Sequence, residues 1–404
     1  MKEIYQRKEY LQAAHFFQLY IWAMGLPFHE FLFVKATDQC MGIKMSEPVI
    51  LLESQSPSCN IQAFVEESDT CCYFYLWFHA GWEKAFIKSC WICNVTKAPE
   101  SIDKKAMAEG MAPAMPKQYI NHDINGIHLN KEELSIVWFE EGDAAALLEG
   151  DRLLSVIPGW GGYNNFYGYS RYAVGTAPYA WELTQAYEVL QNRVEKSRKF
   201  WDYIDGEYWE GVQQIHMQTL EAFFGNYEKY FAIDGGNFPP KALVIGKKDN
   251  ICYGITMGVS LLPMPLIEQY YHDKPSDFRR IEIGFASLEE HQDVCMKMYS
   301  FISGISSLPW REISFLGHGH TIPCSVIDGF CAVWLLDSRL LQQINAPVYE
   351  DFMGDKINLL WVVPLKENEY KKIKDYETEE ALKNLAAEIE KIHIFDGTGK
   401  MEGR

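Results

Sequence analysis

Short runs of hydrophobic residues, separated by polar turns, mark the first half of the chain. Aromatic and β-branched residues dominate residues 61–65, 71–78 and 86–92, and polar or glycine-containing segments divide these runs. Similar runs return at residues 136–139 and 153–157. Such runs bounded by turn residues are typical of strands. The first half is therefore predicted to consist mainly of β-structure.

The hydrophobic spacing becomes helical after residue 180. Apolar side chains three, four and seven positions apart predict one face of a long helix that ends near Gly206; they are Leu183, Tyr187, Leu190, Val194, Trp201 and Ile204. A second helical pattern follows directly over residues 212–224.

The second half of the chain mixes strands with few helices. Strands are predicted at residues 242–245, 253–260, 280–285, 313–315, 330–336 and 357–363. The spacing of Ser287 and Glu290 indicates a capping box at the start of a helix that ends before Pro309. A last helix is predicted to begin near residue 378. Strands and helices do not alternate regularly, which favours an α+β fold with a mixed or antiparallel sheet flanked by helices.

A chain of 404 residues is too long for one ordinary core, so two parts are expected. We expect an N-terminal α+β region over residues 1–208 and a second domain over residues 209–404. Residues 97–118 are rich in Ala, Met, Gly and Pro and are predicted to be a connector with at most a turn or two of helix. The apolar segment 11–28 is interrupted by Gln12, His15 and Gln18, so it is interpreted as a buried amphipathic helix, not a signal peptide or membrane span.

Charge narrows the possible partners. The chain has 37 Lys and Arg against 55 Asp and Glu, a formal net charge of −18, and no block rich in Lys or Arg. Such a chain repels nucleic-acid phosphates and anionic lipids. We therefore expect a basic protein partner, and neither nucleic acid nor membrane. Ten cysteines without a repeating framework indicate a reducing, cytoplasmic location.

Two segments carry residue types that bind metals or react as thiols. If residues 317–324 are extended, His318 and His320 project from one face, which is a metal-ligating geometry, with Cys324 as a third ligand. The alternative is a loop, which the glycines in this segment allow, in which the imidazoles form hydrogen bonds with nearby backbone groups. Cys90 and Cys93 form a C-x-x-C motif, but their run predicts a strand that would point them to opposite sides, so buried thiols are favoured.

A glycine-rich loop after residue 157 is the best candidate for a binding surface. It lacks the spacing of a phosphate-binding loop but is crowded with aromatic residues, which with Arg dominate binding hot spots; the candidates are Trp160, Tyr163, Phe166, Tyr167, Tyr169 and Arg171. The alternative is that half of these side chains fill the seam between the two parts.

No arrangement of a nucleophile, a base and an oxyanion donor is visible in the sequence. The G-x-S-x-G motif is absent, and the acidic group Glu140, Glu141 and Asp143 is expected to be solvated. The sequence therefore favours a protein that is not an enzyme and needs no cofactor. The alternative is a metal-dependent hydrolase that uses His318 and His320.

The second half resembles the suppressor-of-fused domain family, mainly over residues 220–400. The resemblance rests on residues 253–260 (YGITMGVS), 280–285 (RIEIGF), 330–336 (FCAVWLL) and 357–365 (INLLWVVPL), together with the helix ending at residues 308–310 and the loop 317–324. Residues 154–172 are similar to the longer bacterial members.

This resemblance implies a non-enzymatic module that binds protein. Animal members hold a transcription factor by pairing with an extended peptide, and bacterial members include immunity proteins that neutralise toxins. Animal members place an acidic residue after the serine of the G-x-S strand, whereas this chain has Leu261 there. No binding residue is therefore transferred from them. The expected function is binding and neutralising a basic toxin domain.

Overall fold

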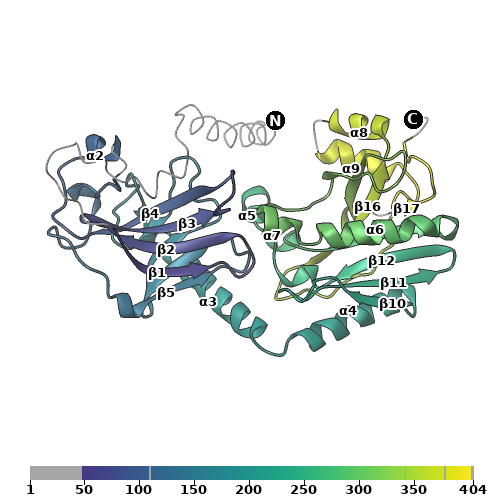
Figure 1. Ribbon diagram of the computed structural model, residues 1–404, viewed down its shortest axis with the longest axis horizontal. Coiled ribbons are helices and arrows are strands. Elements are labelled where there is room, and N and C mark those ends of the chain that lie inside the picture. The colour runs from purple at the N-terminus through teal and green to yellow at the C-terminus, as the bar shows by residue number, and fades with distance from the viewer. Residues whose placement is uncertain (1–47, 109–110, 342, 377–378, 402–404) are drawn as a thin grey trace.

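The computed structural model describes residues 48–108, 111–341, 343–376 and 379–401, which form three β-sheets with helices around them (Figure 1). The α+β class predicted from the sequence is confirmed. The apolar segment 11–28 lies outside the described residues. Among the described helices, none is long and apolar enough to cross a membrane.

Two sheets in the first half of the chain pack against each other. One is an antiparallel sheet of order β1-β2-β3-β4, and the other has the order β5-β6-β7-β8-β9. The Ser170 hydroxyl donates to the Ile92 carbonyl at 2.9 Å and so ties the two sheets together. The strands are β1 (Val49–Gln55), β2 (Ile61–Glu67), β3 (Cys71–Phe78), β4 (Phe86–Asn94), β5 (Leu134–Trp138), β6 (Ala145–Glu149), β7 (Arg152–Ile157), β8 (Tyr169–Ser170) and β9 (Trp181–Glu182).

Several expectations for this half are confirmed. Cys90 and Cys93 lie on β4 and are buried as free thiols, as expected for a strand. In the described residues of the connector there is one short α-helix, α2 (Lys104–Ala108), and a 3₁₀ turn begins at Lys117. The long helix α3 (Tyr187–Ile204) buries Leu190, Val194 and Ile204, the positions that the helical spacing selects.

The second half is built on one large mixed sheet. Its main order is β10-β11-β12-β13-β16-β15-β14, and the central pair β13–β16 is parallel while the other neighbours in this order are antiparallel. β17 pairs with the end of β13. The strands are β10 (Lys229–Ala232), β11 (Ala242–Lys248), β12 (Ile251–Met257), β13 (Arg280–Leu288), β14 (Thr321–Pro323), β15 (Ala332–Asp337), β16 (Ile357–Leu365) and β17 (Ile394–Phe395).

Helices cover both faces of this sheet (Figure 1). On β16, Leu360 and Val362 belong to the core under α6, whereas Leu359 and Trp361 belong to the core shared with α4, α8 and α9. The alternation follows from the two-residue period of a strand. The helices are α4 (Trp209–Phe224), α5 (Ile267–Tyr270), α6 (Gln292–Ile305), α7 (Leu308–Glu312), α8 (Glu367–Lys374) and α9 (Glu379–Ala387).

Two local predictions for the second half are wrong, and one helix was not predicted. The capping box fails because Ser287 is still part of β13, where it pairs with Cys252 and Phe395, and α6 starts only at Gln292. Residues 313–315 are not a strand, since Ile313 ends α7 with φ of 50°. Helix α8 was missed because its exposed face is charged and only Ile373 supplies a buried apolar side chain.

Residues of the G-x-S strand surround a buried carboxylate. Glu282 on β13 accepts hydrogen bonds from the hydroxyls of Thr256 and Ser260, each at 2.7 Å, and from the Gly258 and Ser260 N–H groups at 2.9 and 3.1 Å. Gly258 has φ of +93°, and a Cβ there would lie 2.4 Å from the Pro240 carbonyl oxygen. The motif residues therefore form an internal hydrogen-bond network of the domain.

Replacing Glu282 tests this network. Glu282→Ala leaves buried donors without an acceptor, so we expect the free energy of unfolding to fall by about 3 kcal/mol or more. Glu282→Gln keeps one acceptor oxygen and should lose less. Urea denaturation measures both, with the exposed Glu290→Ala as control, for which a change below about 0.5 kcal/mol is expected. Equal losses for Glu282→Ala and Glu290→Ala would contradict the role of the network.

Candidate functional site

A buried ion cluster joins the two halves of the chain. The turn between β5 and β6 carries Glu140, Glu141 and Asp143, whose exposed fractions are 1%, 5% and 3%. The prediction that this acidic group is solvated is wrong. The physical reason is that arginines from distant parts of the chain lie against the turn and neutralise it.

Arg279, which directly precedes β13, is the centre of this cluster. Its Nη2 lies 3.1 Å from Glu140 Oε2, its Nη1 lies 2.8 Å from Glu141 Oε1, and its Nε lies 2.8 Å from Asp355 Oδ2. The neighbouring Arg280 donates from Nε to the same Asp355 oxygen at 2.8 Å. Arg279 thus connects the first half with two segments of the second half.

Arg193 adds the long helix α3 and the short helix α5 to the cluster. Its Nη2 donates to both carboxylate oxygens of Glu141 at 2.6 Å, and its Nη1 lies 3.0 Å from Glu268 Oε1. Burial alone would raise the pKa of Glu141, but Arg193 and Arg279 outweigh it and lower that pKa to about 2. Burial, together with the nearby Glu141, raises the pKa of Glu268 to about 7.

Asp143 and the start of the glycine-rich loop both contact the segment that forms α5. Its Oδ2 accepts from the Leu266 N–H at 3.2 Å, just before α5. The Gly159 carbonyl accepts from Lys88 Nζ at 2.6 Å and from Gln269 Nε2 at 2.8 Å. Burial, reinforced by the Glu141 charge, raises the pKa of Asp143 to about 6. The ion cluster therefore holds α5, and α5 in turn contacts the start of the loop through Gln269.

The aromatic residues predicted in the glycine-rich loop have different environments. Phe166 is buried and packs edge-to-face against Tyr169 and Trp181, at centroid distances of 4.9 and 4.8 Å. Phe166 thus stabilises the loop itself. The other candidates are half-buried; they are Trp160, Tyr163, Tyr167, Tyr169 and Arg171.

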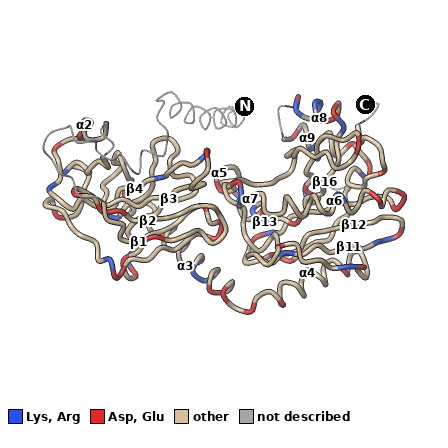
Figure 2. Tube along the Cα trace, in the orientation of Figure 1, with Lys and Arg blue, Asp and Glu red and all other residues tan. Residues whose placement is uncertain are grey.

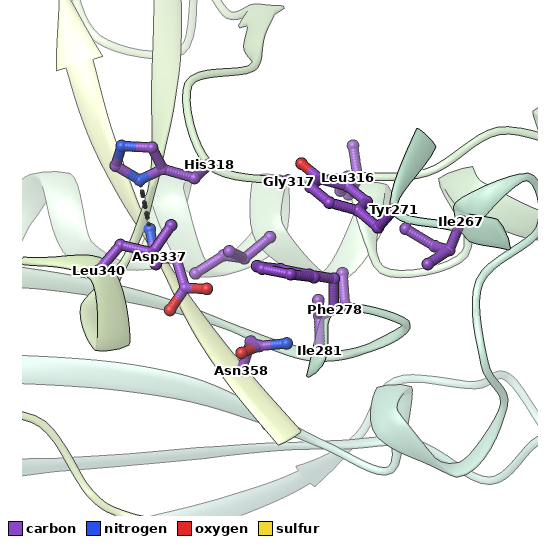
Figure 3. A pocket seen from close by; sticks show the side chains of 11 residues that line it. Ile267, Tyr271, Phe278, Ile281, Leu316, Gly317, His318, Asp337, Leu340 and Asn358 are labelled. Carbon is purple, nitrogen blue, oxygen red and sulfur yellow. Dashed lines mark hydrogen bonds between the residues drawn. The ribbon is translucent and has the colours of Figure 1, made fainter. Parts of the chain in front are cut away.

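The two predicted histidines do not project from one strand. Residues 317–320 form a turn in which Gly319 has φ of +84°, and β14 begins only at Thr321. His318 is buried, its Nδ1 accepts from the Asp337 N–H at 3.1 Å, and burial lowers its pKa to about 4. It lines a cavity of about 10 Å³ with Asp337 and Asn358 (Figure 3). Within the described residues, no group of three or more His, Cys, Asp and Glu is placed to hold a metal ion.

Helix α5 lies between the two predicted loops. Gln269 contacts the glycine-rich loop through Gly159, and the neighbouring Tyr270 packs on Phe315 with ring centroids 4.8 Å apart. Phe315 in turn packs on His320 at 4.9 Å. The structure thus brings the two loops to either side of one short helix.

The hairpin between β3 and β4 adds aromatic residues that sequence reasoning missed. Trp82, Phe86 and Ile87 are 45%, 40% and 39% exposed, although they are large and apolar. Lys84 Nζ lies 2.5 Å from Glu312 Oε2 and so joins the hairpin to α7. The sequence feature that could have indicated this hairpin is Gly81-Trp82, which lies between two runs rich in aromatic residues.

We call the resulting apolar face the joint surface. It combines exposed and half-buried side chains of both halves, on segments that the Lys84–Glu312 ion pair, the Gln269–Gly159 hydrogen bond and the Phe315–His320 ring contact connect to α5 and α7. Its members are Trp82, Phe86, Ile87, Trp160, Tyr270 and His320. Aromatic side chains on a rigid framework are typical anchors of protein–protein interfaces.

Comparison with protein families gives a match for a segment of the second half. Residues 239–398 match the family model of the suppressor of fused protein, which confirms the resemblance for this segment. The match indicates a protein-interaction module. It includes Gly258, Ser260 and Glu282 of the internal network. Searches among curated proteins and among solved structures found no match.

Removing Arg279 tests whether the ion cluster stabilises the joint. Arg279→Ala removes the closest cation of the buried Glu140 and one of the two guanidinium partners of Glu141 and Asp355. We therefore expect the free energy of unfolding to fall by about 3–5 kcal/mol. The control Arg311→Ala breaks an exposed pair with Glu312 and should change it by less than about 1 kcal/mol. Urea unfolding followed by tryptophan fluorescence measures both. A small loss for Arg279→Ala would show that the cluster is dispensable.

Asp143 gives the joint a specific pH dependence. Because its pKa is raised from 3.8 to about 6, the folded protein binds this proton more tightly than the unfolded chain does, and the contribution of Asp143 to stability decreases as pH rises from about 4 to 6. The stability difference between wild type and Asp143→Asn should therefore fall by about 3 kcal/mol across this window. Urea unfolding at several pH values tests this. The exposed Asp202→Asn should show a constant difference, and a constant difference for Asp143→Asn would refute the prediction.

Proposed function

We propose that this chain is a non-enzymatic protein-binding module that neutralises a basic toxin domain. The observation that carries the proposal is the joint surface. There the hairpin that carries Trp82 is joined to α7 through the Lys84–Glu312 ion pair, and Trp160 follows Gly159, whose carbonyl accepts from Gln269 beside Tyr270. Exposed tryptophan and tyrosine on a framework held by buried ion pairs can bind with little loss of conformational entropy. The match of residues 239–398 to a family of protein-interaction modules supports the protein-binding part of the proposal.

The charge distribution supports a basic partner. Arg193, Arg279 and Arg280 offset most of the carboxylate charge at the joint, so most of the net charge of −18 is carried elsewhere. Exposed acidic residues extend from the last turn of α3 to the first turn of α4 (Figure 2). They are Asp202, Asp205, Glu207 and Glu210. A negative surface accelerates the encounter with a positive partner and disfavours other partners.

Two further features belong to this proposal. We place the domain boundary after residue 208, so that residues 1–208 and 209–404 are separate folding units joined where α3 ends at Ile204 and α4 starts at Trp209. We place the protein in the cytoplasm, and the free thiols among the described cysteines support a reducing location.

The product of the neighbouring gene is the first partner to test. We expect a basic domain that kills cells when expressed alone and is harmless when expressed together with this chain. Its affinity for the Trp82→Ala, Trp160→Ala double variant should be about 100-fold lower, because truncating each anchor costs about 1–2 kcal/mol. Isothermal titration calorimetry measures the affinity.

The control Phe231→Ala removes an equally exposed aromatic residue on β10 and should leave the affinity unchanged. The association rate should also fall steeply with added salt. Wild-type affinity of the double variant would disprove the assignment of the joint surface. A neighbouring product that neither binds nor is neutralised would disprove the proposed function.

A further inference from the structure

A cleft in the first half of the chain is lined by basic and neutral side chains, whereas the chain as a whole is acidic. It has a volume of about 550 Å³, and its polar lining comes from Asn121, Arg152, Arg171, Tyr172, Thr184 and Tyr187. None of these side chains is a carboxylate, although the chain carries a net charge of −18. The volume is in the range of sites for small molecules.

Arg171 is held rigidly at this cleft. Its backbone N–H donates to the Leu154 carbonyl at 2.7 Å, and its side-chain Nε donates to the Leu153 carbonyl at 2.8 Å. Its guanidinium carbon lies 5.8 Å from the centroid of the Tyr187 ring. Within the described part of the chain, neither Nη group has a carboxylate within ion-pair distance. Arg171 therefore offers a positioned, uncompensated cation.

Arg152 supplies further donors beside Arg171. Its charge is balanced by Glu149, a carboxylate that also accepts from the Asn130 N–H at 2.8 Å. A guanidinium has five N–H donors, so this pairing leaves donors for a ligand. Arg152 thus adds hydrogen-bonding capacity, and the net positive charge of the cleft comes from Arg171.

Tyr172 gives the cleft a fixed aromatic wall. Its ring meets the His122 ring edge-on at 5.6 Å, and His122 stacks on the Trp91 ring at 5.8 Å. The Asn121 N–H donates to the Tyr172 carbonyl at 3.0 Å, and Asn121 Nδ2 donates to the Arg171 carbonyl at 3.2 Å. The aromatic wall and the cation are therefore tied to each other through Asn121.

We infer that this cleft binds a small anion that carries a planar ring, such as a nucleoside monophosphate or an aromatic carboxylate. Guanidinium groups bind phosphate and carboxylate oxygens through paired hydrogen bonds. Tyr172 and Tyr187 offer aromatic faces for the ring. This binding requires no protein partner, so it is independent of the proposed function.

Calorimetric titration of the full chain at low salt tests the inference. The probes are AMP as the phosphate and indole-3-acetate as the carboxylate, with adenosine lacking the charge and ribose 5-phosphate lacking the ring. We expect AMP or indole-3-acetate to bind at least about tenfold more tightly than adenosine and ribose 5-phosphate. Tighter binding of AMP would identify a phosphate as the preferred acid group, and tighter binding of indole-3-acetate would identify a carboxylate. Failure of both to bind at about 1 mM overturns the inference.

Variants locate the binding to this cleft. Arg171→Ala should weaken the preferred anion at least about tenfold, whereas Lys199→Ala on α3, which removes the same charge from an exposed position, should not. Thr184→Glu adds a carboxylate at an exposed lining position and should weaken binding similarly without disturbing the Arg171 contacts. Unchanged binding in Thr184→Glu, or in folded Arg171→Ala, would place the anion elsewhere and overturn the inference.

Discussion

The relation between the two halves depends on the guanidinium of Arg279. Removing this cation and its carboxylate partners from water is costly, and only close ion pairs offset the cost. Arg279 has carboxylates within 3.1 Å on both sides of the joint, from Glu140 and Glu141 on one half and Asp355 on the other. Any rotation of the halves would leave a buried charge uncompensated. The ion cluster therefore favours one arrangement.

The joint surface follows from this constraint. Arg193 and Asp143 extend the cluster to α5, and α5 positions both the glycine-rich loop and the Phe315–His320 contact. No single segment of the sequence contains this surface. The arginine-lined cleft differs because its walls all belong to the first half, so it does not depend on the joint.

Local patterns predicted the longer strands, α3 and the α+β class because these depend mainly on hydrophobic spacing. Local patterns gave wrong predictions where the environment of a residue depends on residues far away along the chain. Glu140 and Glu141 precede a glycine and resemble a solvated turn, but Arg279, which buries them, lies 139 positions from Glu140 along the chain. Likewise, His318 and His320 would share a face only in a strand, and the positive φ of Gly319 makes the segment a turn. Ser287 has the spacing of a cap, yet its strand pairing prevails.

The residues that carry the family resemblance also explain why the resemblance does not identify a binding partner. Gly258, Ser260 and Glu282 bind one another in the interior, so they specify a scaffold and not a contact with a partner. Trp82 and Trp160 of the joint surface lie outside the matched segment 239–398. Substitutions there change what the surface contacts without disturbing the internal network. The same internal scaffold can therefore carry different contact surfaces.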